Sequence, residues 1–149
     1  MTSLVFRVLD LHVVGGLADH PAIEDERGPM SYAQLLHDSA CVAAAISHLG
    51  VESGTPVTID LPDGRDQIIA VLACARLGAV PVIGAIYRFA GVPAMFHTAE
   101  TEASWDLLIR AGRTEPHPAP DKDPDGYEEL MREAYGDVFA VLTAGGTVS

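Results

Sequence analysis

The first clear hydrophobic pattern in this chain covers residues 31–49. Apolar side chains recur there at intervals of seven, four and three positions, which places them on one face of a helix: Leu35, Val42, Ile46 and Leu49. Ser31 with Gln34 three positions later is a capping-box signature, and Gly50 is typical of the residue just after a helix end. The pattern therefore predicts a helix over 31–49.

The next pattern has the period of two that is typical of a strand. Apolar and polar residues alternate over 57–61, a helical period returns over 64–77, and a short apolar run follows over 79–83. Strand, helix and strand joined by short links predict a βαβ unit with parallel strands and a right-handed crossover. Pro81 either makes the second strand an edge strand or stands where no backbone donor is needed.

The remaining segments have weaker patterns. We expect a short helix within 1–20, a hairpin over 22–31, a short helix within 91–100, a strand over 105–109, an acidic and proline-rich surface loop over 114–126, a helix over 127–135 and a last strand over 138–143. These elements predict one α/β domain over 1–149, with a mostly parallel sheet flanked by helices. Its core should include Leu35, Val42, Ile46, Ile59, Ile68, Leu72 and Val82.

Composition narrows the class of partner. Nine basic and 21 acidic side chains give a net charge of −12, which argues against nucleic acid and against an anionic membrane surface as partners. Cys41 and Cys74 have neither metal-binding nor redox spacing, so we expect buried free thiols in a reducing compartment. The sequence shows neither the pattern of a signal peptide nor an uninterrupted apolar run of membrane-spanning length, so we expect a cytoplasmic location.

The last segment offers a candidate phosphate site. The apolar run over 138–143 leads into Gly145-Gly146-Thr147, and a strand that feeds a glycine-bearing loop is a common way to bind phosphate through backbone N–H groups. The candidate nucleotide-binding residues are Thr143, Gly145, Gly146 and Thr147. An ordinary polar turn is the alternative.

A few titratable side chains give a second candidate site. Arg88, His97 and Glu100 are near one another in the sequence and could form an acid–base site, whereas a solvated or ion-paired Arg88 is the simpler interpretation. His37 and His48 lie on the predicted helix, but two histidines do not make a metal site, so we expect them to be solvated or packed. We predict neither a catalytic residue set nor a metal site.

The order of the motifs resembles the N-terminal part of the adenylate-forming ligase superfamily, which includes acyl-CoA synthetases, aryl-acid–AMP ligases and peptide-synthetase adenylation domains. The similarity covers residues 21–84 and rests on six short motifs in the family's order: Pro21-Ala22-Ile23, Ser31-Tyr32-Ala33-Gln34-Leu35, Leu49-Gly50-Val51, Gly54-Thr55-Pro56-Val57, Leu61-Pro62-Asp63 and Leu77-Gly78-Ala79-Val80-Pro81-Val82. Tyr87-Arg88 resembles a His-Arg pair of aryl-acid-activating members, which implies that Arg88 binds substrate. Residues 144–147 resemble the start of the family's phosphate loop.

The resemblance also implies which parts are missing from this sequence. Ala144 stands where the family has serine, and the chain stops before the lysine of the phosphate loop. The groups that support magnesium and ribose, and the mobile C-terminal domain with its catalytic lysine, are absent as well. Adenylation needs positive charge and metal to stabilise the reacting phosphorus. We therefore expect no adenylation by this chain alone.

Three functional hypotheses follow. The first is a non-catalytic stand-alone relic of the ligase N-terminal subdomain, which acts in protein interaction, regulation or small-molecule binding and needs no cofactor. The second is one half of a split acyl- or aryl-acid–AMP (CoA) ligase, which would use ATP and Mg²⁺ once a partner chain completes it. The third is a repurposed enzyme with new chemistry. Because this segment packs against later chain in complete ligases, we expect a homodimer or a complementary ligase chain as partner.

Overall fold

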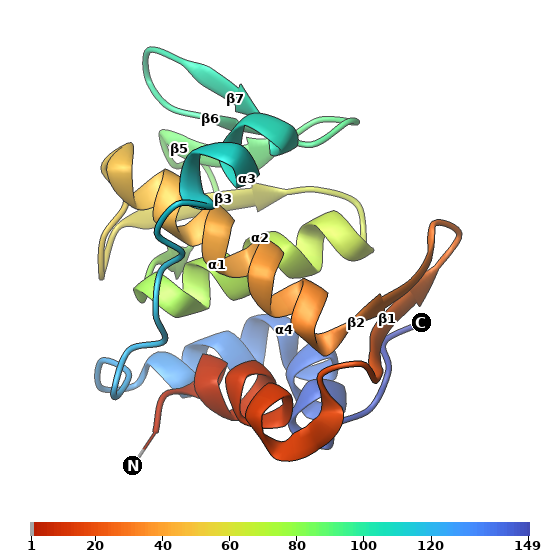
Figure 1. Cartoon of the computed structure of the whole chain (residues 1–149). Coiled ribbons are helices and arrows are strands. Elements are labelled where there is room, and N and C mark those ends of the chain that lie inside the picture. The colour runs from red at the N-terminus through yellow and green to blue at the C-terminus, as the bar shows by residue number, and fades with distance from the viewer. Residues whose placement is uncertain (1) are drawn as a thin grey trace. The chain divides into compact units, whose positions relative to one another are not determined.

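The computed structural model describes residues 2–149, and its contacts divide the chain into two compact units (Figure 1). Unit 1 contains the residues up to His37 together with Ala119–Ser149, and unit 2 is Asp38–Pro118. The single domain expected over 1–149 stays a prediction.

Unit 1 combines a helical N-terminal segment, a hairpin and the last helix of the chain. Its elements are η1 (Phe6–Asp10), η2 (Val13–Leu17), β1 (Pro21–Asp25), β2 (Gly28–Ser31), the first turns of α1 (Tyr32–His48), and α4 (Tyr127–Thr143). Strands β1 and β2 pair antiparallel across a tight turn. The hairpin expected over 22–31 and the helix expected within 1–20 are therefore confirmed.

Unit 2 is built on a five-stranded sheet in the order β4-β3-β5-β6-β7. Its elements after α1 are β3 (Pro56–Asp60), α2 (Arg65–Leu77), β4 (Val80–Pro81), β5 (Tyr87–Ala90), β6 (Met95–His97), β7 (Glu102–Ser104) and α3 (Trp105–Gly112). β3 runs parallel to β4 and β5, whereas β5, β6 and β7 pair antiparallel, so the sheet is mixed. The α/β class and the β3-α2-β4 unit are confirmed, and Pro81 does lie in an edge strand.

Most of the expected core is buried. Five of the seven predicted positions are at most 2% exposed: Leu35, Val42, Ile46, Ile68 and Leu72. Ile59 is half-buried, and the prediction for Val82 is wrong because this side chain is 39% exposed. The Val82 N–H still donates to the Val57 carbonyl of β3 (2.9 Å), but β4 is an edge strand whose two residues are themselves only partly buried, so the Val82 side chain is not covered.

The two cysteines are free and buried, as expected. Burial raises the pKa of the Cys74 thiol to about 12, which makes it a packing residue rather than a nucleophile.

The strand expected over 138–143 is wrong, because these residues form the second half of α4. Tyr135 has a non-helical backbone (φ −136°, ψ 37°), and the helix continues beyond this kink. Phe139 and Leu142 are both fully buried and lie three positions apart, which is the spacing of one helix face. A short apolar run fits a buried strand and a buried helix equally well, so the local pattern could not distinguish the two.

Two further secondary-structure predictions are wrong: one expected strand is a helix, and one expected helix is a turn followed by a strand. The strand expected over 105–109 is helix α3, because the Ser104 hydroxyl accepts a hydrogen bond from the Leu107 N–H (3.2 Å) and caps the helix. The short helix expected within 91–100 is instead a turn followed by β6, in which Phe96 pairs with Phe89 of β5. In both cases a cap or a long-range strand pairing outweighed the local apolar pattern.

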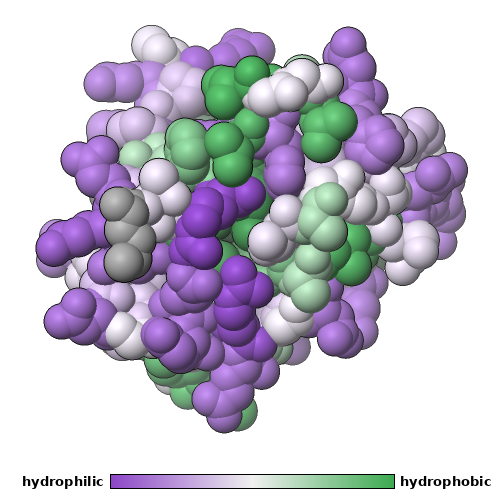
Figure 2. Space-filling model, turned by 90° about the horizontal axis from the view of Figure 1, so that it is seen from below, coloured by the Kyte–Doolittle hydropathy of each residue, from purple (hydrophilic) through white to green (hydrophobic). Residues whose placement is uncertain are grey.

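The molecular surface seen from below is mainly hydrophilic, with hydrophobic patches between the polar residues (Figure 2). The large apolar side chains that unit 1 exposes are Leu11, Val14 and Leu130. None of the helices within residues 2–149 has the length and hydropathy of a membrane span.

Candidate functional site

The glycine-bearing segment expected to bind phosphate lies at the C-terminal end of α4. The Gly145 N–H donates to the Leu142 carbonyl (3.0 Å), and the Gly146 N–H donates to the Val141 carbonyl (2.9 Å). Gly145 has a left-handed backbone (φ +75°), which is typical of a residue that ends a helix. These backbone N–H groups therefore bind carbonyl groups in the last turn of α4.

The residues after Gly146 are attached to β1. The Thr147 hydroxyl donates to the Pro21 carbonyl (2.6 Å), and Val148 exchanges backbone hydrogen bonds with Ala22 and Glu24 (2.8 Å each). The Tyr32 hydroxyl donates to the Gly146 carbonyl (2.6 Å), and burial raises the pKa of Tyr32 to about 12. The whole segment is held by unit 1 itself.

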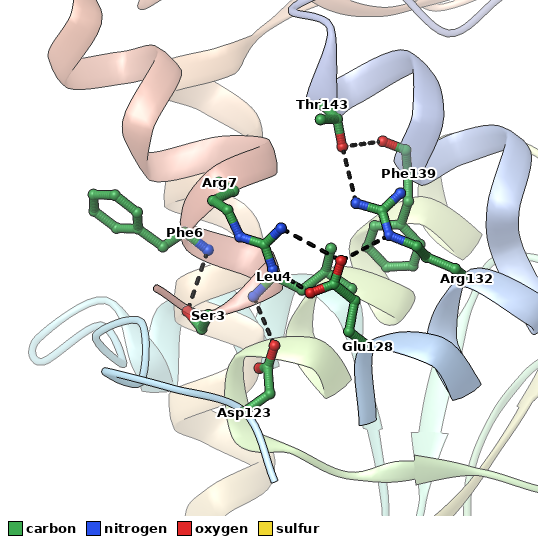
Figure 3. Close-up of polar contacts among 9 residues, drawn as sticks. All are labelled: Ser3, Leu4, Phe6, Arg7, Asp123, Glu128, Arg132, Phe139 and Thr143. Atoms are coloured by element: carbon green, nitrogen blue, oxygen red, sulfur yellow. Dashed lines mark hydrogen bonds and ion pairs between the residues drawn. The ribbon is translucent and has the colours of Figure 1, made fainter. Parts of the chain in front are cut away.

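Thr143 belongs to a polar network between η1 and α4 (Figure 3). Its hydroxyl donates to the Phe139 carbonyl (2.6 Å) and accepts from Arg132 (3.5 Å). Arg132 also donates to Glu128 (2.9 Å), and Arg7 forms an ion pair with the same carboxylate. The hydrogen bond from Arg7 and then that from Arg132 lower the pKa of Glu128. This network ties the N-terminal helical segment to α4.

These contacts do not fit a phosphate group at Thr143, Gly145, Gly146 and Thr147. Three backbone N–H groups of the segment, on Gly145, Gly146 and Val148, already donate to protein carbonyls. The segment also follows the C-terminal end of a helix, where the helix dipole disfavours an anion. Nucleotide binding by these four residues stays a prediction, and it requires another conformation of the segment.

The second candidate region lies on the sheet of unit 2. Strand register places Arg88 of β5 opposite His97 of β6, and His97 opposite Glu102 of β7. The parallel pairing of β3 and β5 places Thr58 beside Arg88. Residues opposite one another in register point to the same side of a sheet. The four side chains therefore form one polar row, which we call the Arg88 row.

The other side of the same sheet is apolar. Phe89, Phe96 and Ala103 alternate with the Arg88 row and are at most 9% exposed. Helix α3 packs against this side (Figure 1). The rings of Phe89 and Trp105 lie 5.6 Å apart there. Arg88 and Glu102 are exposed, and Thr58 and His97 are partly exposed.

Two of the three residues proposed for an acid–base site, Arg88 and His97, lie together in the structure. The third, Glu100, does not lie beside His97, and Glu102 does. Arg88 and His97 are neighbours across β5 and β6, but the carboxylate beside His97 is that of Glu102, with Nδ1 and Oε2 3.5 Å apart. Glu100 lies in the tight turn between β6 and β7, where its N–H donates to the Thr98 hydroxyl (3.3 Å). The turn residues Thr-Ala-Glu-Thr after His97 are the sequence signal that could have identified Glu102.

An exposed apolar segment, residues 82–86, borders the Arg88 row. Ile83 is fully exposed, and Ile86 is 67% exposed. The Ala85 N–H donates to the Thr58 hydroxyl (2.8 Å), which holds the segment beside the row.

His37 and His48 are exposed, in line with the solvated alternative. Residues 2–149 contain no cluster of three or more His, Cys, Asp or Glu side chains arranged to hold a metal ion.

The sequence is similar to one known protein family and to individual members of the acetyl-coenzyme A synthetases. Residues 12–115 match the family model described as AMP-binding enzyme. The acetyl-coenzyme A synthetase of Deinococcus radiodurans is 42% identical over 84 residues, which are 53% of this chain and 13% of that protein. The acetyl-coenzyme A synthetase of Mycolicibacterium smegmatis is 34% identical over 108 residues, which are 67% of this chain and 11% of that protein.

Among solved structures, the chain is similar to the N-terminal subdomain of Klebsiella oxytoca NpsA in complex with 3-hydroxybenzoyl-AMSN. The TM-score is 0.60 at 18% identity, over 81% of this chain and 35% of that chain. This likeness supports the fold alone, and the fold agrees with the expected ligase N-terminal subdomain.

Proposed function

This chain belongs to the AMP-binding enzyme family, and we propose that it acts there as a non-catalytic interaction module. It corresponds to an N-terminal portion of an adenylate-forming ligase, and it spans 13% of the length of the Deinococcus radiodurans relative. The two buried free cysteines fit a reducing compartment, so the proposal includes a cytoplasmic location.

The observation that carries the proposal is the exposed apolar segment 82–86. Val82, Ile83 and Ile86 are 39%, 100% and 67% exposed. Exposed apolar side chains that are close together favour contact with another protein, because contact removes them from water. The partner is a second copy of the chain or a ligase chain.

The chain is non-catalytic in this proposal because the backbone donors of its glycine-bearing segment already bind protein carbonyls. The Gly145 and Gly146 N–H groups donate to carbonyls of α4, so they are not directed at a phosphate. ATP and Mg²⁺ are cofactors of the proposed function only if another chain supplies the groups that hold them.

Light scattering across a dilution series tests the proposal, first on the chain alone and then with the Deinococcus radiodurans synthetase added. We expect association in one of the two samples, and its loss in Ile83→Asp. Val92→Asp is the matched control, because Val92 is also highly exposed (86%) but lies in the loop after β5. A monomer in both samples, or equal losses in the two variants, would contradict the proposal.

The second candidate function is one half of a split acyl- or aryl-acid ligase. The observation in its favour is the 42% identity over 84 residues to an acetyl-coenzyme A synthetase. The test combines this chain with a Deinococcus radiodurans synthetase that lacks the matching segment, and measures ATP–pyrophosphate exchange. Exchange that needs both chains supports the split ligase, and no exchange from the pair rejects it.

A further inference from the structure

We propose that the outer edge of β1, the edge that does not pair with β2, is a binding site for an extended peptide, and that segment 144–149 occupies this site as an internal ligand. Binding of this kind adds a strand to a sheet edge. The site lies in unit 1, whereas the exposed apolar segment 82–86 belongs to unit 2. The inference is therefore independent of the proposed function, and either can fail without the other.

Strand β1 is paired with a full strand on one edge only. It forms a two-stranded antiparallel sheet with β2. On its outer edge, the Val148 N–H donates to the Ala22 carbonyl and the Glu24 N–H donates to the Val148 carbonyl (2.8 Å each). These two bonds flank Ile23 in the pattern of a parallel strand pair. Segment 144–149 therefore binds β1 as a short third strand would (Figure 1).

Two hydroxyl groups add contacts beside this strand pair. The Thr147 hydroxyl donates to the Pro21 carbonyl (2.6 Å), and the Tyr32 hydroxyl donates to the Gly146 carbonyl (2.6 Å). The Thr147 bond depends on a side chain of the bound segment, whereas the Tyr32 bond reaches a backbone carbonyl that any residue would supply. The site should therefore select threonine at the first of these positions.

The start of the segment lies against two residues of the N-terminal helical segment. A Cβ atom on Gly145 would lie 3.1 Å from Leu17 Cδ1 and 3.6 Å from His12 Cε1. The His12 ring is itself fixed, because Nε2 donates to the Leu142 carbonyl at the end of α4 (2.6 Å). Since ordinary contact begins at 3.4 Å, the site favours glycine at this position.

Charge indicates which residue should follow the β-branched one in a ligand. In a parallel pair that keeps its register, the residue after Val148 comes beside Glu24. Residues 24–26 are all acidic, and the chain as a whole has a net charge of −12. A lysine or arginine should therefore bind there better than Ser149 does. The expected ligand is an extended segment with glycine, threonine, a β-branched residue and a basic residue in this order.

The test opens the site in the full chain with Val148→Pro, because proline has no N–H to donate to the Ala22 carbonyl. The probe is a fluorescently labelled peptide with the sequence of residues 143–149, Thr-Ala-Gly-Gly-Thr-Val-Ser, and its anisotropy reports binding. We expect saturable binding to Val148→Pro and about tenfold weaker binding to the unmodified chain. An internal ligand on a short link acts at about 1 mM, so it weakens a peptide with a Kd of about 0.1 mM by about tenfold.

Ser149→Pro is the matched control variant, since it places the same residue in the same segment but leaves the Val148 N–H in place. It should bind the peptide as weakly as the unmodified chain does. Equal binding of the peptide to all three proteins would overturn the site.

Variant peptides test the expected ligand chemistry. A peptide with threonine and valine exchanged has the same composition but no hydroxyl at the Pro21 carbonyl, so it should bind about fivefold more weakly. Lysine in place of the final serine should tighten binding, and glutamate should weaken it. Equal binding of the exchanged peptide would refute the threonine contact, and equal binding of the lysine and glutamate peptides would refute the charge preference.

Hydrogen exchange of backbone amides tests the site without a variant. The Glu24 and Val148 amides are both protected only by the pairing of the segment with β1, so they should have the same protection factor. We expect that factor to be at least about tenfold lower than those of the amides that pair β1 with β2. In Val148→Pro, the Glu24 amide should lose protection and regain it with saturating peptide. Protection equal to that of the hairpin would show that the segment does not open separately, and would overturn the proposal.

Discussion

Replacing Gly112 by alanine should strongly destabilise unit 2. A Cβ atom at this position would lie 1.9 Å from the Cys41 carbonyl oxygen and 2.9 Å from the Cys41 Cα. Ordinary contact begins at 3.4 Å, so α3 and α1 would have to separate by about 1.5 Å (3.4 − 1.9). The obstacle is backbone in the middle of α1, which cannot rotate away as a side chain can.

The size of the effect follows from two opposing contributions. Overpacking costs about 1–3 kcal/mol, and a backbone obstacle places this case at the upper end of that range. Alanine in place of glycine returns up to about 1 kcal/mol of helix propensity. The net loss should be about 2 kcal/mol, a large part of a typical stability of about 5–15 kcal/mol. Urea unfolding followed by circular dichroism should show a midpoint about 1 M lower, for a slope of about 2 kcal/mol per M.

Gly136→Ala is the matched control. Gly136 lies within α4 without a left-handed backbone, and no atom lies within 4 Å of a Cβ at this position. The same chemical change should therefore stabilise the protein by about 0.5–1 kcal/mol. If Gly112→Ala were as stable as the unmodified chain, the close approach of α3 to α1 at Cys41 would be refuted.

Three further predictions concern stability, pH and activity. Ile46→Ala should cost about 2–5 kcal/mol in urea unfolding, because the side chain is fully buried. Glu128→Gln should flatten the acid side of the stability–pH curve. Arg7 and Arg132 hold the pKa of Glu128 below its ordinary value of 4.5, so its contribution is complete above that pH and is lost as the pH falls through the lowered value. Purified chain should show no ATP–pyrophosphate exchange with acyl or aryl acids.

Each of these predictions has a control or a contradicting result. Val14→Ala, at a side chain that is 77% exposed, should change stability by less than about 0.5 kcal/mol. An equal acid response of Glu128→Gln and the unmodified protein would show that the network in Figure 3 contributes nothing to folding. Exchange above background, with contaminating ligase excluded, would contradict a non-catalytic chain.

The segments that the sequence predicted well are those whose signals are local. The helix over 31–49, the strand over 57–61 and the helix over 64–77 each have a regular period of their own, and glycine marks the end of both helices. Their order also carried the family resemblance. In contrast, the apolar run over 138–143 has no period that separates helix from strand, and its assignment depended on which side chains become buried.

The candidate sites likewise contain residues that the sequence alone could identify and contacts that it could not. The sequence identified Arg88 and His97 as residues of interest, because the chemistry of each side chain can be recognised from its residue type alone. It did not identify Glu102 as the partner of His97, because that pairing follows from the turn that joins β6 to β7. For the segment after α4, the sequence showed glycines and a threonine, but hydrogen bonds to the helix end and to β1 decided what those groups do.

By itself, then, the sequence determined the family, the α/β class and the elements whose periodicity and end signals are contained within a few turns of chain. The tertiary structure decided the mixed pairing of the sheet, the helical state of residues 138–143 and the row of Arg88, His97 and Glu102. The physical reason is that periodicity and capping act between near neighbours in sequence. Strand register and burial, however, join residues far apart, and a shift of one residue would turn each side chain to the other face of the sheet.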